Sequence, residues 1–233
     1  MNQYDNPAFF DAYSQMSRSQ LGLDGAGEWH QLKPMFPDLN RKRVLDLGCG
    51  YGWHCKFAET QGATAVVGID QSERMIEEAG IRNSGEIIQY RVCGIEEYEY
   101  PEERFDLVVS NLVLHYVENL AEIYRKVYKT LTDGGRFLFN IEHPVFTAGV
   151  NQQWSTDGYW LVDNYYYPGE RNAEFLGHPV KKYHHTLTQI LNGLLQAGFV
   201  IEAVEEAIPP EEWREQMPEE MRRPMMLLVR ARK

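Results

Sequence analysis

The stretch VLDLGCGYGW at residues 44–53 places three glycines at alternate positions directly after a short apolar run. Glycine is required where the backbone adopts positive φ or where a ligand approaches the main chain closely. A tight turn between a strand and a helix needs one such residue, whereas Gly48, Gly50 and Gly52 follow one another here. The spacing therefore predicts a ligand-binding loop at the carboxyl end of a strand, where open α/β sheets bind their ligands.

Around this loop, short apolar runs alternate with helical patterns. Strands are predicted over residues 43–47, 65–70, 87–92, 105–111, 136–142, 199–207 and 225–233. Helices are predicted over 7–20, 26–34, 53–61, 120–131 and 186–197, and from an N-cap at Ser72. Strands alternating with helices of about ten residues indicate a parallel sheet covered on both faces. We therefore expect an α/β fold with a doubly wound, mostly parallel, seven-stranded Rossmann-like sheet.

The chain reads as one domain, residues 1–233, with residues 1–40 forming a helical lid. Residues 143–185 interrupt the alternation after the fifth strand and are rich in aromatic residues, glycine and proline. We expect this insertion to cover the substrate, because aromatic side chains form apolar ligand walls. The same side chains could instead form a satellite core or a homodimer contact. A structureless loop of about 40 residues is unusual, so short strands or helices are expected inside it.

Composition restricts the classes of function. The formal net charge of −11 disfavours nucleic acid as a partner. No secretory signal is expected in the first residues, and no apolar run approaches the roughly 18 residues of a membrane span. Cys49, Cys55 and Cys93 lack metal-ligand spacing. We therefore expect a cytoplasmic protein with reduced thiols, no bound metal and no membrane partner.

The residues around the glycine loop indicate which ligand it takes. A dinucleotide fingerprint would require glycine at position 53, where this chain has Trp53. Asp46 precedes the glycines, and its charge would repel a diphosphate but favour a sulfonium ligand with an amino-acid tail. Asp70 closes the second strand, where a carboxylate can accept hydrogen bonds from both hydroxyls of a ribose.

Three motifs together resemble the class I S-adenosylmethionine-dependent methyltransferases: VLDLGCGYG, VVGIDQSERMIEEA and FDLVVSNLVLHYV. The resemblance covers residues 43–142 in sequence and residues 186–233 by the order of elements. The flanking stretches SRSQLGLDGAGEW, EHPVFTAG and VKKYHHTL resemble a bacterial small-molecule branch of that family. The resemblance implies S-adenosyl-L-methionine as cofactor and a small molecule as methyl acceptor.

Family roles carry over to the glycine loop and to the end of the second strand. The resemblance implies that Gly48, Cys49 and Gly50 pass under the methionine part of the cofactor. Asp46 would order this loop and the cofactor's amino group, and Asp70 would hold the ribose.

The resemblance also implies an adenine site. Gln71 and Met75 would flank the ring, although Met75 could equally be a core residue. The family often holds the adenine amino group with an aspartate after the third strand, and that position is Gly94 here. This departure leaves the Ile95 backbone and Glu96 as substitutes.

Further candidates lie before the first strand and after the fourth. Tyr13 and Arg18 resemble lid residues of the family, and Arg18 could pair with the cofactor carboxylate or form a surface salt bridge. Asn111 and His115 follow the fourth strand on the methyl-donor side.

Methyl transfer from a sulfonium depends mainly on alignment and exclusion of water, and a base is needed only where the acceptor must lose a proton. His115 and His143 are the candidate bases, although either could instead order its loop through hydrogen bonds. Arg171, Lys181 and Lys182 are candidates to meet an anionic acceptor. The substrate-binding residues expected in the insertion are Trp160, Tyr166, Arg171, Tyr183 and His184.

Two other functions are compatible with a sheet of this kind. A nicotinamide-dependent oxidoreductase is disfavoured by Trp53 and by the leading Asp46. A non-catalytic protein that keeps the cofactor fold is disfavoured by the intact acids and glycines of the loop.

Overall fold

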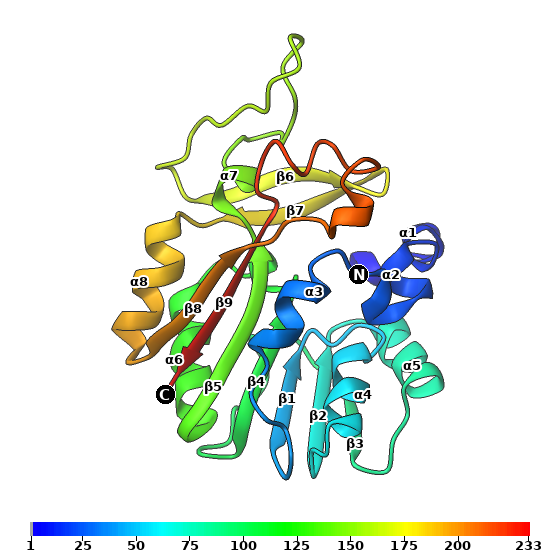
Figure 1. Cartoon of the computed structure of the whole chain (residues 1–233), viewed down its shortest axis with the longest axis vertical. Helices are drawn as coiled ribbons and strands as arrows, with labels where there is room; N and C mark the ends of the chain where they lie inside the picture. Colours follow the sequence, from blue (N-terminus) through cyan, green and yellow to red (C-terminus); the bar gives the residue numbers. More distant parts are fainter. Residues whose placement is uncertain (1) are drawn as a thin grey trace.

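The computed structural model describes residues 2–233 and is built around a seven-stranded sheet (Figure 1). The order across the sheet is β3-β2-β1-β4-β5-β9-β8. Within the described residues, β9 alone runs antiparallel to its neighbours, which confirms the predicted fold class. The strands are β1 (Arg43–Leu47), β2 (Ala65–Asp70), β3 (Ile88–Val92), β4 (Phe105–Asn111), β5 (Leu131–Glu142), β8 (Val200–Glu206) and β9 (Met226–Arg232).

Local capping signals set the helix boundaries. α4 (Trp53–Thr60) begins after Gly52, whose φ of 78° is left-handed. The Ser72 side chain accepts the Met75 amide and starts α5 (Glu73–Arg82), as predicted. Thr186 forms the predicted capping box of α8 (Leu187–Ala197), which ends at a left-handed Gly198. α6 (Leu120–Thr130) ends where β5 begins, so this strand starts five residues earlier than predicted.

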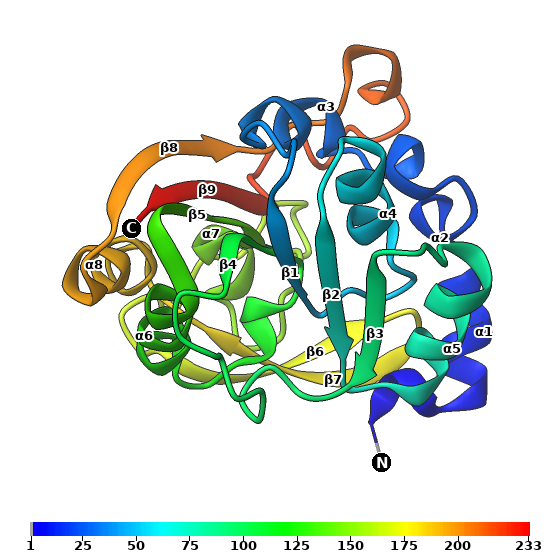
Figure 2. The same cartoon turned by 90° about the horizontal axis from the view of Figure 1, so that it is seen from below.

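Helices lie on both faces of the sheet (Figure 2), and each face carries an apolar core. The first packs α6 and α8 against the strands, and the second packs α3 (Trp29–Leu32) and α4 against the other face. Adjacent strand residues belong to different cores, with Val44 in the second and Leu45 in the first, because side chains alternate along a strand. The helices therefore cover both faces, as expected.

The N-terminal region differs from the two helices predicted. It consists of η1 (Gln3–Asp5), α1 (Pro7–Ser14), α2 (Ser17–Gln20), η2 (Gly22–Gly25), α3 and η3 (Lys33–Met35). Met16 is extended and separates α1 from α2. Gly25 packs against the backbone of Ser17, where a Cβ would lie 2.2 Å from the carbonyl oxygen. The chain therefore folds back on itself in short turns, which places this region beside the carboxyl ends of the strands (Figure 1).

The insertion after β5 contains helical and strand segments, as expected for a segment of this length. It begins with α7 (Pro144–Thr147) and includes the hairpin of β6 (Gly169–Phe175) and β7 (His178–His184). The hairpin crosses above the carboxyl end of the large sheet, and an irregular segment between α7 and β6 projects beyond it (Figure 1). No helix within residues 2–233 has the length and hydropathy needed to cross a membrane.

Candidate active site

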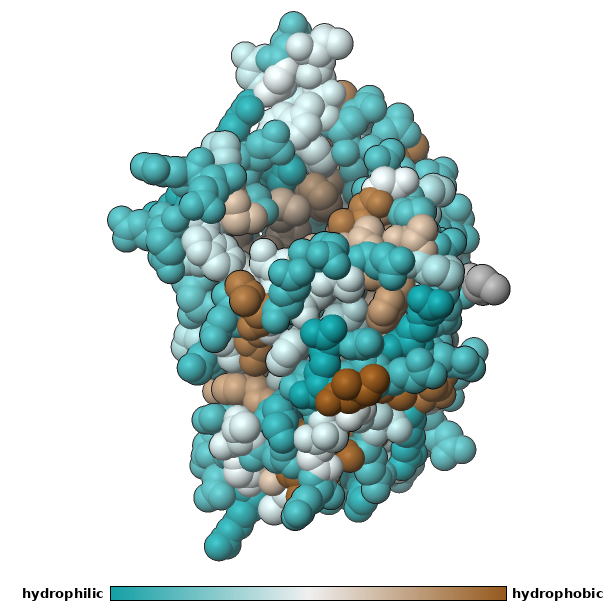
Figure 3. Space-filling model, turned by 90° about the vertical axis from the view of Figure 1, so that its right-hand side faces the viewer, coloured by the Kyte–Doolittle hydropathy of each residue, from teal (hydrophilic) through white to brown (hydrophobic). Residues whose placement is uncertain are grey.

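A cavity of about 910 Å³ lies at the carboxyl ends of the parallel strands. Its walls come from the N-terminal region, the glycine loop, the strand ends, the β6–β7 hairpin and residues 213–226. Ligand pockets commonly measure about 300–1,000 Å³, so this cavity lies near the upper end of that range. The face in Figure 3 is hydrophilic over much of its area and is hollowed in its upper half, where hydrophobic side chains are exposed.

The glycine loop presents bare backbone to the cavity. The amides of Gly48 and Cys49 both donate to the Ile69 carbonyl at 2.8 Å, which fastens the loop to the end of β2. Gly48 has a φ of 72°, and a Cβ there would lie 2.2 Å from the Val113 side chain. Gly50 has a φ of 51°, and a Cβ there would meet no atom of the described chain within 4 Å. Close packing requires the first glycine, whereas the second leaves space for a ligand.

Asp70 joins the loop to the next helix and lines the same cavity. Its Oδ2 accepts the Gly50 amide at 3.0 Å, and its Oδ1 accepts the Ser72 amide at 2.9 Å. Burial raises the pKa of this carboxyl to about 6, although the two amide hydrogen bonds oppose the shift. Each carboxylate oxygen has a second lone pair, so hydroxyl groups of a ligand can still be accepted.

Asp46 lies behind the loop and not on the cavity wall. Its Oδ2 accepts the Cys55 thiol at 3.3 Å, whereas its Oδ1 is buried without a hydrogen-bond partner in the described chain. Burial raises the pKa of Asp46 to about 7. A positive charge close to a buried carboxylate stabilises its ionised form. Within the described residues, the only hydrogen-bond donor to the Asp46 carboxylate is the Cys55 thiol.

The expected adenine residues come together. Gln71, Met75, Gly94, Ile95 and Glu96 all line the cavity. Met75 is also buried in the apolar interior, so its position is compatible with both expected roles. A Cβ on Gly94 would meet nothing closer than Glu97 Oε2 at 3.6 Å, so the glycine leaves room that a side chain would otherwise occupy.

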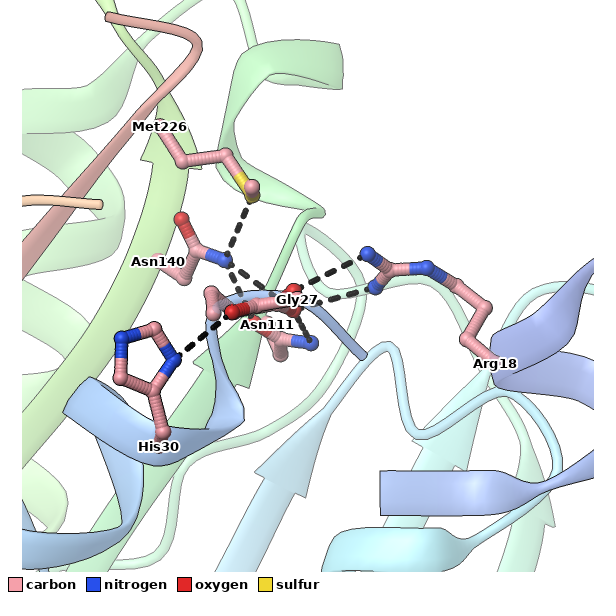
Figure 4. Close-up of polar contacts among 7 residues, drawn as sticks. Arg18, Gly27, His30, Asn111, Asn140 and Met226 are labelled. Atoms are coloured by element: carbon pink, nitrogen blue, oxygen red, sulfur yellow. Dashed lines mark hydrogen bonds and ion pairs between the residues drawn. The ribbon is translucent and has the colours of Figure 1, made fainter. Parts of the chain in front are cut away.

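Arg18 belongs to a buried polar cluster (Figure 4). Its Nη1 and Nη2 atoms each donate to one oxygen of Glu28 at 3.1 Å. Asn111 Nδ2 donates to Glu28 Oε1 at 3.2 Å, and Asn140 Nδ2 donates to Asn111 Oδ1 at 2.9 Å. Glu28 is 1% exposed; burial alone would raise its pKa, but the Arg18 charge and the hydrogen bonds from Arg18 and Asn111 together lower it.

This cluster corrects the expectation of a surface salt bridge for Arg18, because its partner is buried. Arg18, Tyr13 and Asn111 nevertheless line the cavity, as the resemblance implied. Glu28 was not predicted as a site residue although it lies within the stretch SRSQLGLDGAGEW, because its partners Arg18, Asn111 and Asn140 lie on three separate elements.

The two candidate bases have different surroundings. His115 lines the cavity; its Nδ1 accepts the Glu142 amide at 3.5 Å, and burial lowers its pKa to about 4. His143 does not line the cavity. Its Nδ1 accepts the Val145 amide at 3.0 Å and caps α7, while its Nε2 lies 3.0 Å from Glu206 Oε1. The structure thus gives His143 the loop-ordering role that was its alternative.

The expected substrate residues do not line the main cavity. Trp160 lines a separate hollow of about 270 Å³, and Tyr166 is 85% exposed. Arg171 is buried and donates to main-chain carbonyls, including those of Ala148 and Tyr167.

The other two residues of this set lie on β7. His184 is held by Thr147 and by the Tyr165 carbonyl, and Tyr183 lies on the opposite face of β7 beside Lys181. These side chains therefore build the insertion, and its wall toward the cavity is made by Phe175 and Lys182.

Several lining residues were not predicted. Tyr4 and Tyr116 approach each other with their hydroxyls 3.1 Å apart, and Glu142 ends β5. The segment after β8 adds Trp213 and Glu220. Glu142 could have been found from its place at a strand end, whereas residues 213–220 carry no local signal. Within residues 2–233, no three His, Cys, Asp or Glu side chains are grouped to hold a metal ion.

Comparison with known proteins decides the family. Residues 45–139 match the model of a methyltransferase domain. A crystal structure of an S-adenosylmethionine dependent methyltransferase from Mesorhizobium loti is 40% identical and superposes with a TM-score of 0.85, covering 91% of this chain and 100% of that one. The chain belongs to the S-adenosylmethionine-dependent methyltransferases. A candidate methyltransferase from Listeria monocytogenes is 45% identical, with a TM-score of 0.86 and coverage of 91% and 99%.

A further relative of this methyltransferase matches along nearly the whole chain. It is an uncharacterised protein of Haemophilus influenzae that is 30% identical and covers 99% of this chain and 96% of its own. The family makes the chain an enzyme with S-adenosylmethionine as cofactor, and it leaves the oxidoreductase and the non-catalytic alternatives without support.

The residues that line the cavity of this methyltransferase are suited to bind S-adenosylmethionine. The Gly48–Gly50 backbone leaves open space, Asp70 offers hydrogen-bond acceptors, and room remains beside Gly94. These features follow β1, β2 and β3, so the cofactor would occupy that half of the cavity. The other half of the cavity lies over the ends of β4 and β5.

The Asp46→Asn variant tests the burial of this carboxylate. The pKa of Asp46 is raised in the folded state, so ionisation of this carboxyl disfavours folding. The parent protein therefore loses stability as pH rises toward and through about 7. The Tm of the variant minus the Tm of the parent is therefore expected to increase as pH rises through 7. Thermal unfolding followed by circular dichroism measures both proteins well below and well above that pH.

A difference in Tm that does not change with pH would contradict a raised pKa at Asp46. Asp133→Asn, at an exposed position near the start of β5, is the control and should show no such trend.

Proposed function

We propose that this methyltransferase acts on a small molecule held over the ends of β4 and β5. The observation that carries the proposal is the enclosure of this half of the cavity by His115, Glu142, Phe175 and Lys182. The β6–β7 hairpin and the N-terminal region cover this half of the cavity on the side away from the sheet. A polymer substrate would need an open groove there. The net charge of −11 further disfavours a nucleic acid.

The residues of the chain account for positioning and for exclusion of water. The cofactor, when bound, supplies a methyl group on a sulfonium sulfur that leaves as a neutral thioether. Asp70 and the glycine loop would hold its ribose and methionine parts, and Tyr13 and Arg18 close that half from the N-terminal side. The hairpin covers the acceptor half, so the reacting groups would meet in a defined orientation away from water.

Labelled methyl uptake tests the proposal. The purified enzyme is incubated with S-adenosylmethionine carrying a labelled methyl group and with separated small-molecule, protein and RNA fractions of a cell extract. We expect label in the small-molecule fraction, and much less of it with Asp70→Ala at a cofactor concentration that does not saturate the variant. Label that enters only protein or RNA would contradict a small-molecule acceptor.

A further inference from the structure

A buried carboxylate–ammonium pair lies in the acceptor half of the cavity. Glu142 is the last residue of β5, and Lys182 faces it from β7. Lys182 Nζ lies 2.5 Å from Glu142 Oε1, and the two side chains are only 5% and 13% exposed. The ammonium also lies 5.4 Å from the centre of the Phe175 ring and 5.9 Å from that of Tyr116. All four side chains line the cavity.

The second oxygen of this carboxylate is unsatisfied. Glu142 Oε2 is buried and has no hydrogen-bond partner within the part of the chain that the structure describes. A buried acceptor left without a donor carries a free-energy cost, and the cost is larger when the acceptor is charged. Because the side chain lines the cavity, a ligand that brings a donor to Oε2 would remove this cost.

His115 does not compete for the role of proton acceptor. Its Nδ1 accepts the backbone amide of Glu142, which can only donate, so the proton of the neutral ring lies on Nε2. Nε2 then donates, and it lies 3.9 Å from Glu142 Oε1. His115 therefore positions Glu142 through its main chain and supplies no lone pair to the acceptor.

The charges around Oε2 select the kind of acceptor group. A carboxylate or phosphate would face the unpaired oxygen of Glu142 and be repelled. A cationic amine would meet the Lys182 ammonium, and a neutral amine needs no base before it attacks. A hydroxyl can donate to Oε2, and the negative charge that develops on its oxygen is stabilised by Lys182. The Phe175 and Tyr116 rings favour a planar apolar body beside it.

We propose that the acceptor is a weakly acidic hydroxyl on an aromatic or similarly planar compound, with Glu142 as general base and Lys182 as the oxyanion-stabilising residue. The proposal rests on methyl transfer to a small molecule in this cavity. The hydroxyl proton passes to Glu142 Oε2, the oxygen lone pair forms the new bond to the methyl carbon, and the electrons of the broken carbon–sulfur bond remain on sulfur. The products are a methyl ether, a neutral thioether and a protonated Glu142, which then releases its proton to solvent.

Binding of 4-nitrophenol tests the proposal without turnover. Its absorption moves to longer wavelength on ionisation, so a spectrum of the complex with the enzyme loaded with S-adenosylhomocysteine shows whether the bound phenol is ionised. We expect binding with a shift toward the phenolate spectrum, and weaker binding of benzylamine. Calorimetric loading of S-adenosylhomocysteine is measured first, so that loss of the cofactor site is recognised separately.

Two variants assign the effect to the pair. Lys182→Met should weaken 4-nitrophenol binding by about tenfold or more and abolish the shift, because a charge-assisted hydrogen bond is lost. The double variant Glu142→Gln with Lys182→Met keeps the site neutral, so it should fold even if the single change does not. Lys181→Met is the matched control, because this lysine, contrary to the expectation that it meets the acceptor, does not line the cavity; it is exposed on the same strand and pairs with Glu170.

Each possible result of these measurements either supports or overturns the hydroxyl acceptor. Intact loading of S-adenosylhomocysteine together with no binding of 4-nitrophenol overturns the hydroxyl acceptor and leaves the proposed function standing. Binding of benzylamine as tightly as the phenol, or full binding and full spectral shift in the folded double variant, also overturns it. Loss of phenol binding in the double variant with Lys181→Met unchanged supports it.

Discussion

The Glu28→Ala variant is expected to lose about 3–5 kcal/mol of unfolding free energy, because removing one partner of a buried ion pair leaves the other charge unpaired. Glu28 receives both Arg18 Nη atoms and the Asn111 amide, and it is 1% exposed. Without its carboxylate, the guanidinium and the amide lose the acceptor that holds them at the cavity wall. Urea unfolding of parent and variant measures the difference.

A matched control separates this effect from ordinary surface pairing. Glu78 pairs with Arg82 one turn along α5, and its side chain is 26% exposed. Glu78→Ala should cost less than about 1 kcal/mol. Equal losses in the two variants would show that the Glu28 cluster contributes no more than a surface pair.

The cluster also predicts how stability responds to acid. The pKa of Glu28 is lowered in the folded state, so its contribution is complete above the ordinary value of 4.5 and is lost as pH falls through the lowered pKa. The parent should therefore lose stability in that acidic window by more than the Glu28→Ala variant does.

The Asp70→Ala variant is expected to weaken S-adenosylmethionine binding by about a hundredfold. Two charge-assisted hydrogen bonds to the ribose would be lost, each worth about 1.5–3 kcal/mol, and 1.4 kcal/mol corresponds to tenfold. The anchoring of the glycine loop through the Gly50 amide is lost as well. Calorimetry on the folded variant measures the dissociation constant, and an unchanged value would show that Asp70 does not hold the cofactor.

The Asp70→Asn variant keeps the shape of the side chain and removes its charge, so it measures what the charge contributes to cofactor binding. Burial raises the pKa of Asp70 to about 6, and hydroxyl donors favour its charged form, so binding should release a proton below that pH. Affinity of the parent is therefore expected to rise with pH up to about 6 and then level off. The Asn variant should lack this component, and Asp133→Ala should bind like the parent.

Local signals in the sequence were sufficient to predict the sheet and the meeting of the glycine loop and Asp70 at one side of the cavity. Apolar runs, capping residues and glycines act within a few residues of their own position, so they predicted the strands, the cap at Ser72 and the stop at Gly198. Gly48, Gly50 and Asp70 follow consecutive parallel strands whose ends meet at one edge of the sheet. Their proximity therefore follows from strand order alone.

Only the tertiary structure decided the buried partners and the acceptor half. Glu28 meets Arg18 and Asn111 because the N-terminal turns pack against the ends of the strands, and no periodicity records that packing. In the insertion, the twist and placement of the hairpin turn Lys182 toward Glu142, whereas Tyr166 is left in solvent. Composition predicted that this segment covers the substrate, but which side chains face inward depends on contacts between residues far apart in the chain.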